Sequence, residues 1–317
     1  MNAIDYRDRC AGTILGTAFG DALGAAVEGW TADEIRSEHG EIRDFLEGRG
    51  GAGRYTDDTQ MMLGMARSLV RIGKIDGADC ARSCAELFAP ERGYGRSATR
   101  ILMALETGAD YRETATVLFP EGSFGNGAAM RIAPVGLLSG SKEPKLLRPW
   151  VVEAVRATHV HDEAIDGALV VAAAVGILSR MRVFSEVNGP GFLFELSPYC
   201  RTMEMRSRMM LASRLLEEKP SRDEVVARLG NGVRTLESVP TALYTAMRFI
   251  SEPEEALVAA VGYGGDADTI AAMTGAVVGA CHGASAFPQR WHEQLERGAD
   301  GYDALCEVSR QLANLIK

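Results

Sequence analysis

Residues 264–280 read GGDADTIAAMTGAVVGA, a glycine-rich turn and two aspartates that lead directly into an apolar stretch of alanine, glycine and branched residues. Small residues of this kind allow helices to pack closely against one another. The stretch is therefore predicted to be a buried helix whose first turn carries Asp266, Asp268 and Thr269. Residues 11–26 have a similar small and apolar composition.

Helical spacing of apolar residues dominates the rest of the chain. It recurs at 61–70, 165–178, 239–250 and 257–261, while no alternating β pattern, fixed-period repeat or long linker is found. Glycine-rich segments such as 48–53, 122–127 and 262–265 separate these stretches. We therefore predict one compact, all-α, multi-helix domain over residues 1–317, with functional loops between its helices.

Composition narrows the classes of function. The chain has 317 residues, 46% of them hydrophobic, a formal net charge of -9 and a pI of about 5.2. This acidic balance argues against a general nucleic-acid binder, although a few amides and one arginine can hold a small anion. The six cysteines form no C-x-x-C pair, and we see neither a signal peptide nor a membrane span. A cytoplasmic protein is the expectation.

Two acidic clusters, Thr56-Asp57-Asp58-Thr59 and Asp266-Ala267-Asp268-Thr269, each follow a glycine-rich loop and precede a helix. Either cluster alone is typical of helix capping, because Asp and Thr accept hydrogen bonds from free amides. Together they offer more oxygens than capping needs, and divalent cations such as magnesium and manganese prefer such oxygen ligands. The pair predicts a two-metal site between helix N-termini.

Asp21 and Glu28 are the next candidates. Asp21 lies in an apolar stretch, where a carboxylate is unfavourable unless it is paired or hydrogen-bonded, so a structural ion pair is one explanation. Glu28 is either an ordinary surface residue or an acid/base group at the mouth of a site.

Residues 122–131 read GSFGNGAAMR, a glycine-rich loop that is neither a P-loop nor a dinucleotide fingerprint. Glycines let backbone amides approach a ligand, and a helix predicted to start near Gly127 would direct its amides at an anion. Arg131 would pair with a phosphate or with an acidic neighbour. His159 and His161 are read as hydrogen-bonded histidines, without a metal.

In this order, these elements resemble the ADP-ribosylglycohydrolase family. The matching stretches are residues 16–24 (GTAFGDALG), 55–59 (YTDDT), 125–131 (GNGAAMR), 158–159 (TH) and 264–269 (GGDADT). The resemblance implies an all-α fold with two magnesium or manganese ions beside the distal ribose of ADP-ribose. It also implies a set of metal ligands, namely Thr56, Asp57, Asp58, Asp266, Asp268 and Thr269. The implied substrate-binding residues are Gly122, Ser123, Phe124, Gly125, Asn126 and Gly127, with His159 nearby and Gly95 in a ligand-proximal segment.

The resemblance further implies hydrolysis of the bond between C1″ of ADP-ribose and a protein side chain. A monomer is the expectation. Residues 237–244 (ESVPTALY) and the position of Glu28 resemble the serine-reversing branch, whereas residues 131–135 (RIAPV) resemble the arginine-reversing branch. Glu28 is the candidate general acid or base, and Asp58 is the next candidate. The alternatives are a hydrolase of a small derivative such as O-acetyl-ADP-ribose and a non-catalytic ADP-ribose binder.

Overall fold

The computed structural model describes residues 5–48, 50–181 and 187–315, and in these residues all regular structure is helical apart from two isolated bridges. The α-helices are α1 (Tyr6–Gly24), α2 (Ala32–His39), α3 (Asp57–Ile72), α4 (Gly77–Leu87), α5 (Arg96–Glu106), α6 (Ala133–Ser139), α7 (Pro144–Val155), α8 (Asp162–Arg180), α9 (Gly189–Leu196), α10 (Met203–Glu218), α11 (Arg222–Leu229), α12 (Thr235–Arg248), α13 (Pro253–Val261), α14 (Ala267–His282), α15 (Gln289–Gln294) and α16 (Tyr302–Leu315).

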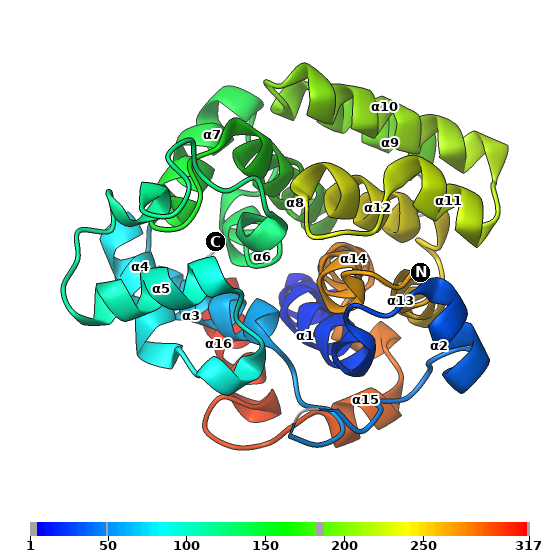
Figure 1. Ribbon diagram of the computed structural model, residues 1–317, viewed down its shortest axis with the longest axis horizontal. Helices are drawn as coiled ribbons and strands as arrows, with labels where there is room; N and C mark the ends of the chain where they lie inside the picture. Colours follow the sequence, from blue (N-terminus) through cyan, green and yellow to red (C-terminus); the bar gives the residue numbers. More distant parts are fainter. Residues whose placement is uncertain (1–4, 49, 182–186, 316–317) are drawn as a thin grey trace.

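Helices α1 and α14 form the centre of the molecule, with the other helices arranged around them (Figure 1). Their backbones touch through glycines. A Cβ atom at Gly275 would lie 1.9 Å from the carbonyl oxygen of Gly16, and one at Gly16 would lie 2.3 Å from that of Gly275. A Cβ at Gly20 would likewise lie 2.1 Å from the oxygen of Ala271. The glycines therefore set a backbone separation that no larger residue permits.

The remaining helices cover this central pair. Helices α8, α12 and α13 pack on α14, while α3 and α16 pack on α1. One continuous hydrophobic core extends from Cys10 on α1 to Ala313 on α16. The predicted all-α, single compact fold is confirmed.

Residues Tyr6–Val27, which contain helix α1, are long and apolar enough to cross a membrane, although no membrane span is predicted from the sequence. Their mean hydropathy is 1.3, yet 83% of their apolar stretch is buried inside the protein. Burial against α14 explains why a helix of this composition forms here, because a helix that is apolar on all sides needs neighbours on all sides.

The prediction of a helix that starts near Gly127 is wrong. Residues Asn126–Ala128 form only a short 3-10 turn, and the next α-helix, α6, begins at Ala133. Pro134 in the first turn of α6 is favourable there because that position has no amide partner to lose. The glycine-rich loop therefore does not lead into an α-helix N-terminus that could direct its amides at a ligand.

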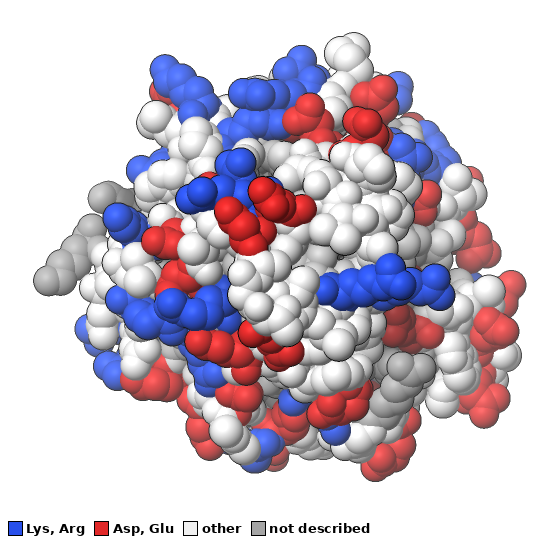
Figure 2. All heavy atoms as spheres, turned by 60° about the vertical axis from the view of Figure 1, so that its left-hand side comes forward, with Lys and Arg blue, Asp and Glu red and all other residues white. Residues whose placement is uncertain are grey.

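Figure 2 shows acidic and basic side chains interspersed over the face formed around α3, α4 and α5, with groups of basic side chains along its upper edge and acidic ones more frequent along its lower edge.

Candidate active site

The first acidic cluster forms the N-terminus of α3 and is held there by Asp21 of α1. One carboxylate oxygen of Asp21 accepts a hydrogen bond of 2.8 Å from the Thr56 amide, and the other accepts bonds from the amide and hydroxyl of Thr59, at 2.9 and 2.5 Å. Asp21 is fully buried, and burial raises the pKa of its carboxyl group. Donors on α3 therefore satisfy Asp21, rather than the ion pair that the sequence left open.

The second acidic cluster begins α14 and is positioned by a tight turn. Gly264 and Gly265 have φ angles of 67° and 66°, a conformation that glycine adopts without strain. The backbone of residues 29–30 pairs with Gly265 through two hydrogen bonds of 2.7 Å. This pairing ties the segment that carries Glu28 to the start of α14.

As a result, residues far apart in the sequence converge. Carboxylate oxygens of Glu28, Asp266 and Asp268 lie within 4.8 Å of one another. The Thr269 hydroxyl lies 3.3 Å from a carboxylate oxygen of Asp58, which joins the α14 cluster to the α3 cluster. Glu28 is exposed, whereas the two aspartates of α14 are buried. The structure thus brings the two predicted acidic clusters together, with Glu28 at their solvent side.

The electrostatics of this cluster favour a bound cation. Burial, followed by repulsion from Asp21, raises the pKa of Asp57 to about 7. Burial raises the pKa of Asp266 to about 6. Burial, followed by repulsion from Asp268, raises the pKa of Asp58 well above the ordinary value. Burial, followed by repulsion from Asp266, does the same for Asp268. A divalent cation among these carboxylates would restore their ionised forms at neutral pH.

The donor set also fits divalent metal on structural grounds. Oδ1 of Asp58 is buried and has no hydrogen-bond partner among the described residues, although such atoms are nearly always satisfied. Thr56 caps α3 through its hydroxyl, but the Asp266 side chain makes no cap hydrogen bond at α14. Capping therefore accounts for one residue of the two clusters and leaves carboxylate oxygens available to magnesium or manganese. The assignment of Thr56, Asp57, Asp58, Asp266, Asp268 and Thr269 as ligands stays a prediction.

The acidic cluster opens onto a cavity of about 400 Å³, which we call the main cavity. Its volume lies within the range of about 300–1,000 Å³ that is usual for small-molecule sites. Six of the predicted substrate-binding residues line it, namely Gly95, Ser123, Gly125, Asn126, Gly127 and His159.

Gly122 and Phe124 do not line the main cavity as the loop prediction expected. Gly122 is buried with φ 83° against the backbone of His161, where it shapes the loop. The Phe124 side chain is 51% exposed and packs edge-on against the His161 ring, with centroids 6.0 Å apart.

Asn126 connects the glycine-rich loop to the acidic cluster. Its side-chain amide donates hydrogen bonds to Asp266 and to the Ser238 hydroxyl, the latter at 3.0 Å. The bond to Asp266 favours the ionised carboxylate and partly opposes the effect of burial on its pKa. Asn126 therefore orients a candidate metal ligand in addition to lining the cavity.

His159 is held in place by Thr158 and Arg131, which line the main cavity with it. Its Nδ1 atom lies 2.8 Å from the Thr158 hydroxyl, to which the buried Arg131 guanidinium also donates. Burial, with a smaller contribution from Arg131, lowers the pKa of His159 to about 3, so the ring is neutral at physiological pH. A Cβ at Gly127 would lie 3.0 Å from the ring, which keeps this face of the loop small. Among the described residues, Arg131 donates to the Gly127 carbonyl and to Thr158 rather than to an acidic neighbour. It also lines the main cavity, so its pairing with a phosphate stays a prediction.

Residues from unpatterned segments also line the main cavity and were missed. Phe119, Arg96 and Val233 contribute to its wall, and the side chains of Phe119 and Val233 are 46% and 65% exposed. Exposed apolar residues in loops have no periodic signal in a sequence. Only their positions around the cavity identify them as candidates for contact with a ligand.

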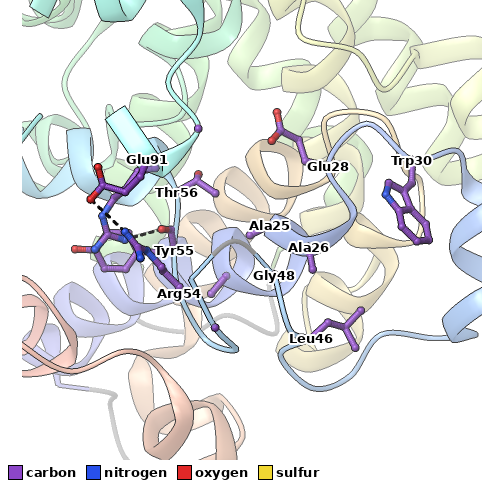
Figure 3. Close-up of a pocket in the computed structure, with 14 residues that line it drawn as sticks. Ala25, Ala26, Glu28, Trp30, Leu46, Gly48, Arg54, Tyr55, Thr56 and Glu91 are labelled. Carbon is purple, nitrogen blue, oxygen red and sulfur yellow. Dashed lines mark hydrogen bonds and ion pairs between the residues drawn. The ribbon is translucent and has the colours of Figure 1, made fainter. Parts of the chain in front are cut away.

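A second cavity of about 220 Å³, which we call the side pocket, adjoins the main cavity and shares Glu28 and Gly93 with it. Figure 3 shows Glu28 at one edge of the side pocket, with Arg54 and Glu91 on one side and Trp30 on the other. Glu28 therefore separates two cavities of different size.

Known proteins resemble this chain over its whole length. The family described as ADP-ribosylglycohydrolase matches residues 2–317. The ADP-ribosyl-[dinitrogen reductase] glycohydrolase of Rhodospirillum rubrum is 32% identical over 320 residues, covering 100% of this chain and 98% of that protein. The ADP-ribosylhydrolase ARH3 of Bos taurus is 30% identical over 340 residues, covering 94% and 91%. A solved structure titled ADP-ribosylglycohydrolase-related protein complex superposes with a TM-score of 0.76 at 27% identity, covering 98% and 99%.

Proposed function

Because the chain belongs to the ADP-ribosylglycohydrolase family and is a hydrolase of glycosyl bonds, we propose that it cleaves the C1″ bond between ADP-ribose and a serine or arginine side chain of a protein. The observation that carries this proposal is the convergence of Glu28 with Asp266 and Asp268 at the inner wall of the main cavity. The cavity has room for a nucleotide-sized ligand, and the carboxylates lie where its sugar end would be processed.

Two divalent cations, magnesium or manganese, are part of the proposal. Thr56, Asp57 and Asp58 would hold them from α3, and Asp266, Asp268 and Thr269 would hold them from α14. Bound there, they would supply electrostatic stabilisation and fix the orientation of ribose hydroxyls. The raised pKa values of these aspartates and the unpartnered Oδ1 of Asp58 support the proposal.

Glu28 is the proposed acid/base residue. It is exposed to both cavities, and it is not a helix cap of α3 or α14. During hydrolysis the acceptor oxygen or nitrogen leaves C1″ with its bonding electrons and takes a proton, while water adds hydroxide to C1″ and releases a proton. Glu28 can exchange one proton with either partner. Asp58 is the second candidate for the base, although its position among the other carboxylates makes metal binding the better-supported role.

The main cavity's other residues would bind the rest of ADP-ribose. Gly125 and Gly127 leave space for close approach of a diphosphate or ribose to the loop backbone. Neutral His159, oriented by Thr158, presents the far side of its ring to the cavity, where it can hydrogen-bond without carrying charge.

A panel of substrates tests the proposal. The purified protein would be incubated with ADP-ribosyl-serine peptide, ADP-ribosyl-arginine peptide and O-acetyl-ADP-ribose, each with magnesium, with manganese and after chelation. We expect release of free ADP-ribose from at least one peptide, and loss of this activity on chelation. Turnover of O-acetyl-ADP-ribose alone would identify a small-molecule hydrolase, and binding of ADP-ribose without any turnover would identify a non-catalytic binder.

We also propose that the protein acts in the cytoplasm as a monomer, without nucleic-acid or membrane partners. All six cysteines are free, which suits a reducing compartment. Sedimentation of the purified protein and fractionation of cells that express it would test the two statements.

A further inference from the structure

Resting on the proposed function, we infer that the side pocket binds the acceptor part of the substrate, and that Arg54 donates hydrogen bonds there to the polypeptide backbone beside the modified residue. The side pocket is lined by Glu28, Trp30, Leu46, Arg54, Thr56 and Glu91, among others. Neither the metal candidates on α14 nor the glycine-rich loop at 122–127 lines it.

The position of the side pocket supports an acceptor role. The bond to be cleaved has ADP-ribose on one side and the acceptor on the other, so the two parts need separate spaces that meet at the acid/base residue. The main cavity and the side pocket meet at Glu28 and Gly93. At the start of α3, Thr56 faces the side pocket while Asp57 and Asp58 face the main cavity.

The size of the side pocket points to the same assignment. Its volume of about 220 Å³ is below the range of about 300–1,000 Å³ usual for complete small-molecule ligands. The main cavity, at about 400 Å³, is within that range. The side pocket therefore has room for an amino-acid side chain and its adjoining backbone, but not for a second nucleotide.

The charged side chains of the side pocket are the carboxylates of Glu28 and Glu91 and two arginines, which are engaged to different extents. Arg92 donates to Glu296 at 2.6 and 3.0 Å and to the Tyr55 carbonyl at 2.6 Å, so its guanidinium is satisfied. Among the described residues, Arg54 has a single ionic contact, at 3.4 Å, with Glu91, whose side chain is 63% exposed. An exposed pair at this distance is weak, so Arg54 keeps donors free for a ligand.

The loop is built around the Arg54 side chain. Gly50 has φ 91°, and a Cβ there would lie 2.3 Å from one guanidinium nitrogen of Arg54. Glycine thus makes space for the guanidinium, whose side chain is only 26% exposed. A peptide carbonyl or carboxylate beside the modified residue would accept hydrogen bonds from Arg54. This holds for any acceptor side chain, because Glu28 and Glu91 in the same pocket leave its charge mixed.

Binding to full-length protein with the Glu28→Gln substitution tests this inference without turnover. The dissociation constants of free ADP-ribose and of an ADP-ribosyl-serine peptide would be measured by calorimetry. We expect the peptide to bind about tenfold more tightly than ADP-ribose, as one charge-assisted hydrogen bond would give. Adding Arg54→Gln should remove that advantage and leave the affinity for ADP-ribose within twofold. Arg36→Gln is the matched control, because Arg36 is a surface arginine outside both cavities.

Turnover by protein with native Glu28 provides the second readout. Arg54→Gln should raise KM for the hydrolysed ADP-ribosyl peptide about tenfold with little change in kcat, whereas Arg36→Gln should change neither. The inference is overturned if Arg54→Gln weakens ADP-ribose and the peptide equally, or if it changes neither the peptide advantage nor the KM for the peptide. If no substrate is hydrolysed but the peptide advantage exists and depends on Arg54, the proposed function fails while the acceptor pocket stands.

Discussion

Glu28 is the residue on which the chemistry most directly depends, because it is the one acidic side chain shared by the two cavities. Replacement by glutamine preserves its size and removes its ability to exchange a proton. We expect Glu28→Gln to lower kcat by about 10²–10⁴-fold, the usual contribution of a general acid or base. The dissociation constant for ADP-ribose should change little. Single-turnover hydrolysis and calorimetry would measure the two quantities.

Glu47→Gln is the control for this substitution, since Glu47 is exposed and lies outside both cavities. Glu47→Gln should have the same kcat and the same dissociation constant for ADP-ribose as the unmodified protein. Full turnover by Glu28→Gln would remove Glu28 from the mechanism and leave Asp58 as the candidate base.

Asp21 supports the site without facing the main cavity or the side pocket. Asparagine in its place would present an NH₂ group to donors on α3 that now meet a carboxylate oxygen. We expect Asp21→Asn to lower the free energy of unfolding by about 1–3 kcal/mol and to weaken cation binding through displacement of Thr56. Urea unfolding and titration with manganese would measure both effects. Asp33→Asn, at a side chain that is 86% exposed, should change neither, and an unchanged manganese affinity in Asp21→Asn would contradict the positioning role.

At the scale of single residues, the sequence allowed the acidic clusters to be predicted because aspartates at helix starts have a fixed relation to the helix that follows. Arg54, Phe119 and Val233 could not be predicted in this way. They lie in loops, where no periodicity relates a residue to its neighbours in space. For Phe124 the motif was misleading, since its place in a ligand-like loop did not reveal that its ring packs against His161 and does not line the main cavity.

Among the helices, the contact between α1 and α14 determines the geometry of the site, because α1 carries Asp21 and α14 begins with the second acidic cluster. An alanine at position 275 would place a Cβ 1.9 Å from the backbone oxygen of Gly16. We expect Gly275→Ala to lower the free energy of unfolding by at least about 1–3 kcal/mol and to reduce activity as the helices separate. Thermal unfolding and the substrate assay would show this.

Gly95→Ala is the stability control for that substitution, since a Cβ at position 95 would meet nothing within 4 Å. It should leave the Tm unchanged. Equal Tm values for Gly275→Ala and the unmodified protein would show that the two backbones can move apart without loss of stability. Close packing of α1 on α14 would then not determine the geometry of the site.

Helix formation was largely predictable from apolar spacing, and the buried helices at 165–178 and 270–280 lie within α8 and α14. The partner of each helix was not predictable. Composition indicates that residues 11–26 and 270–280 both pack closely, but only the structure shows that they pack on each other. The 3-10 turn at 126–128 was mistaken for a helix start because a glycine-rich loop before alanines suits both structures.

For the molecule as a whole, the site gathers carboxylates of like charge in one place. Four aspartates with raised pKa values converge at the ends of helices that the core holds in position. Folding without cations therefore works against carboxylate repulsion, and cations that bind only the folded state should stabilise it. Metal binding and stability are expected to be linked in this protein.

This linkage predicts an unusual dependence of stability on pH after chelation. Between pH 6.5 and 8 the unfolded chain has ionised aspartates, whereas the folded protein retains protons on groups such as Asp57, whose pKa is raised from 3.8 to about 7. The folded state then binds more protons than the unfolded state, so stability falls as pH rises. Three histidines act in the opposite direction, mainly below about pH 7: burial lowers the pKa of His159 from 6.5 to about 3, and it also lowers the pKa values of His282 and His292.

The Tm of chelated protein should therefore fall from pH 6.5 to pH 8, by about 2–4 °C for each kcal/mol lost, and saturating magnesium or manganese should raise the Tm most at pH 8. Differential scanning calorimetry at fixed ionic strength would measure this. A protein with Asp57→Asn and Asp268→Asn removes two of the titrating groups, so its Tm should vary less with pH and respond less to cations. If the Tm of chelated protein rises over this interval instead, the acidic cluster is not protonated in the folded state. Cations would then not stabilise the protein by replacing protons in this cluster.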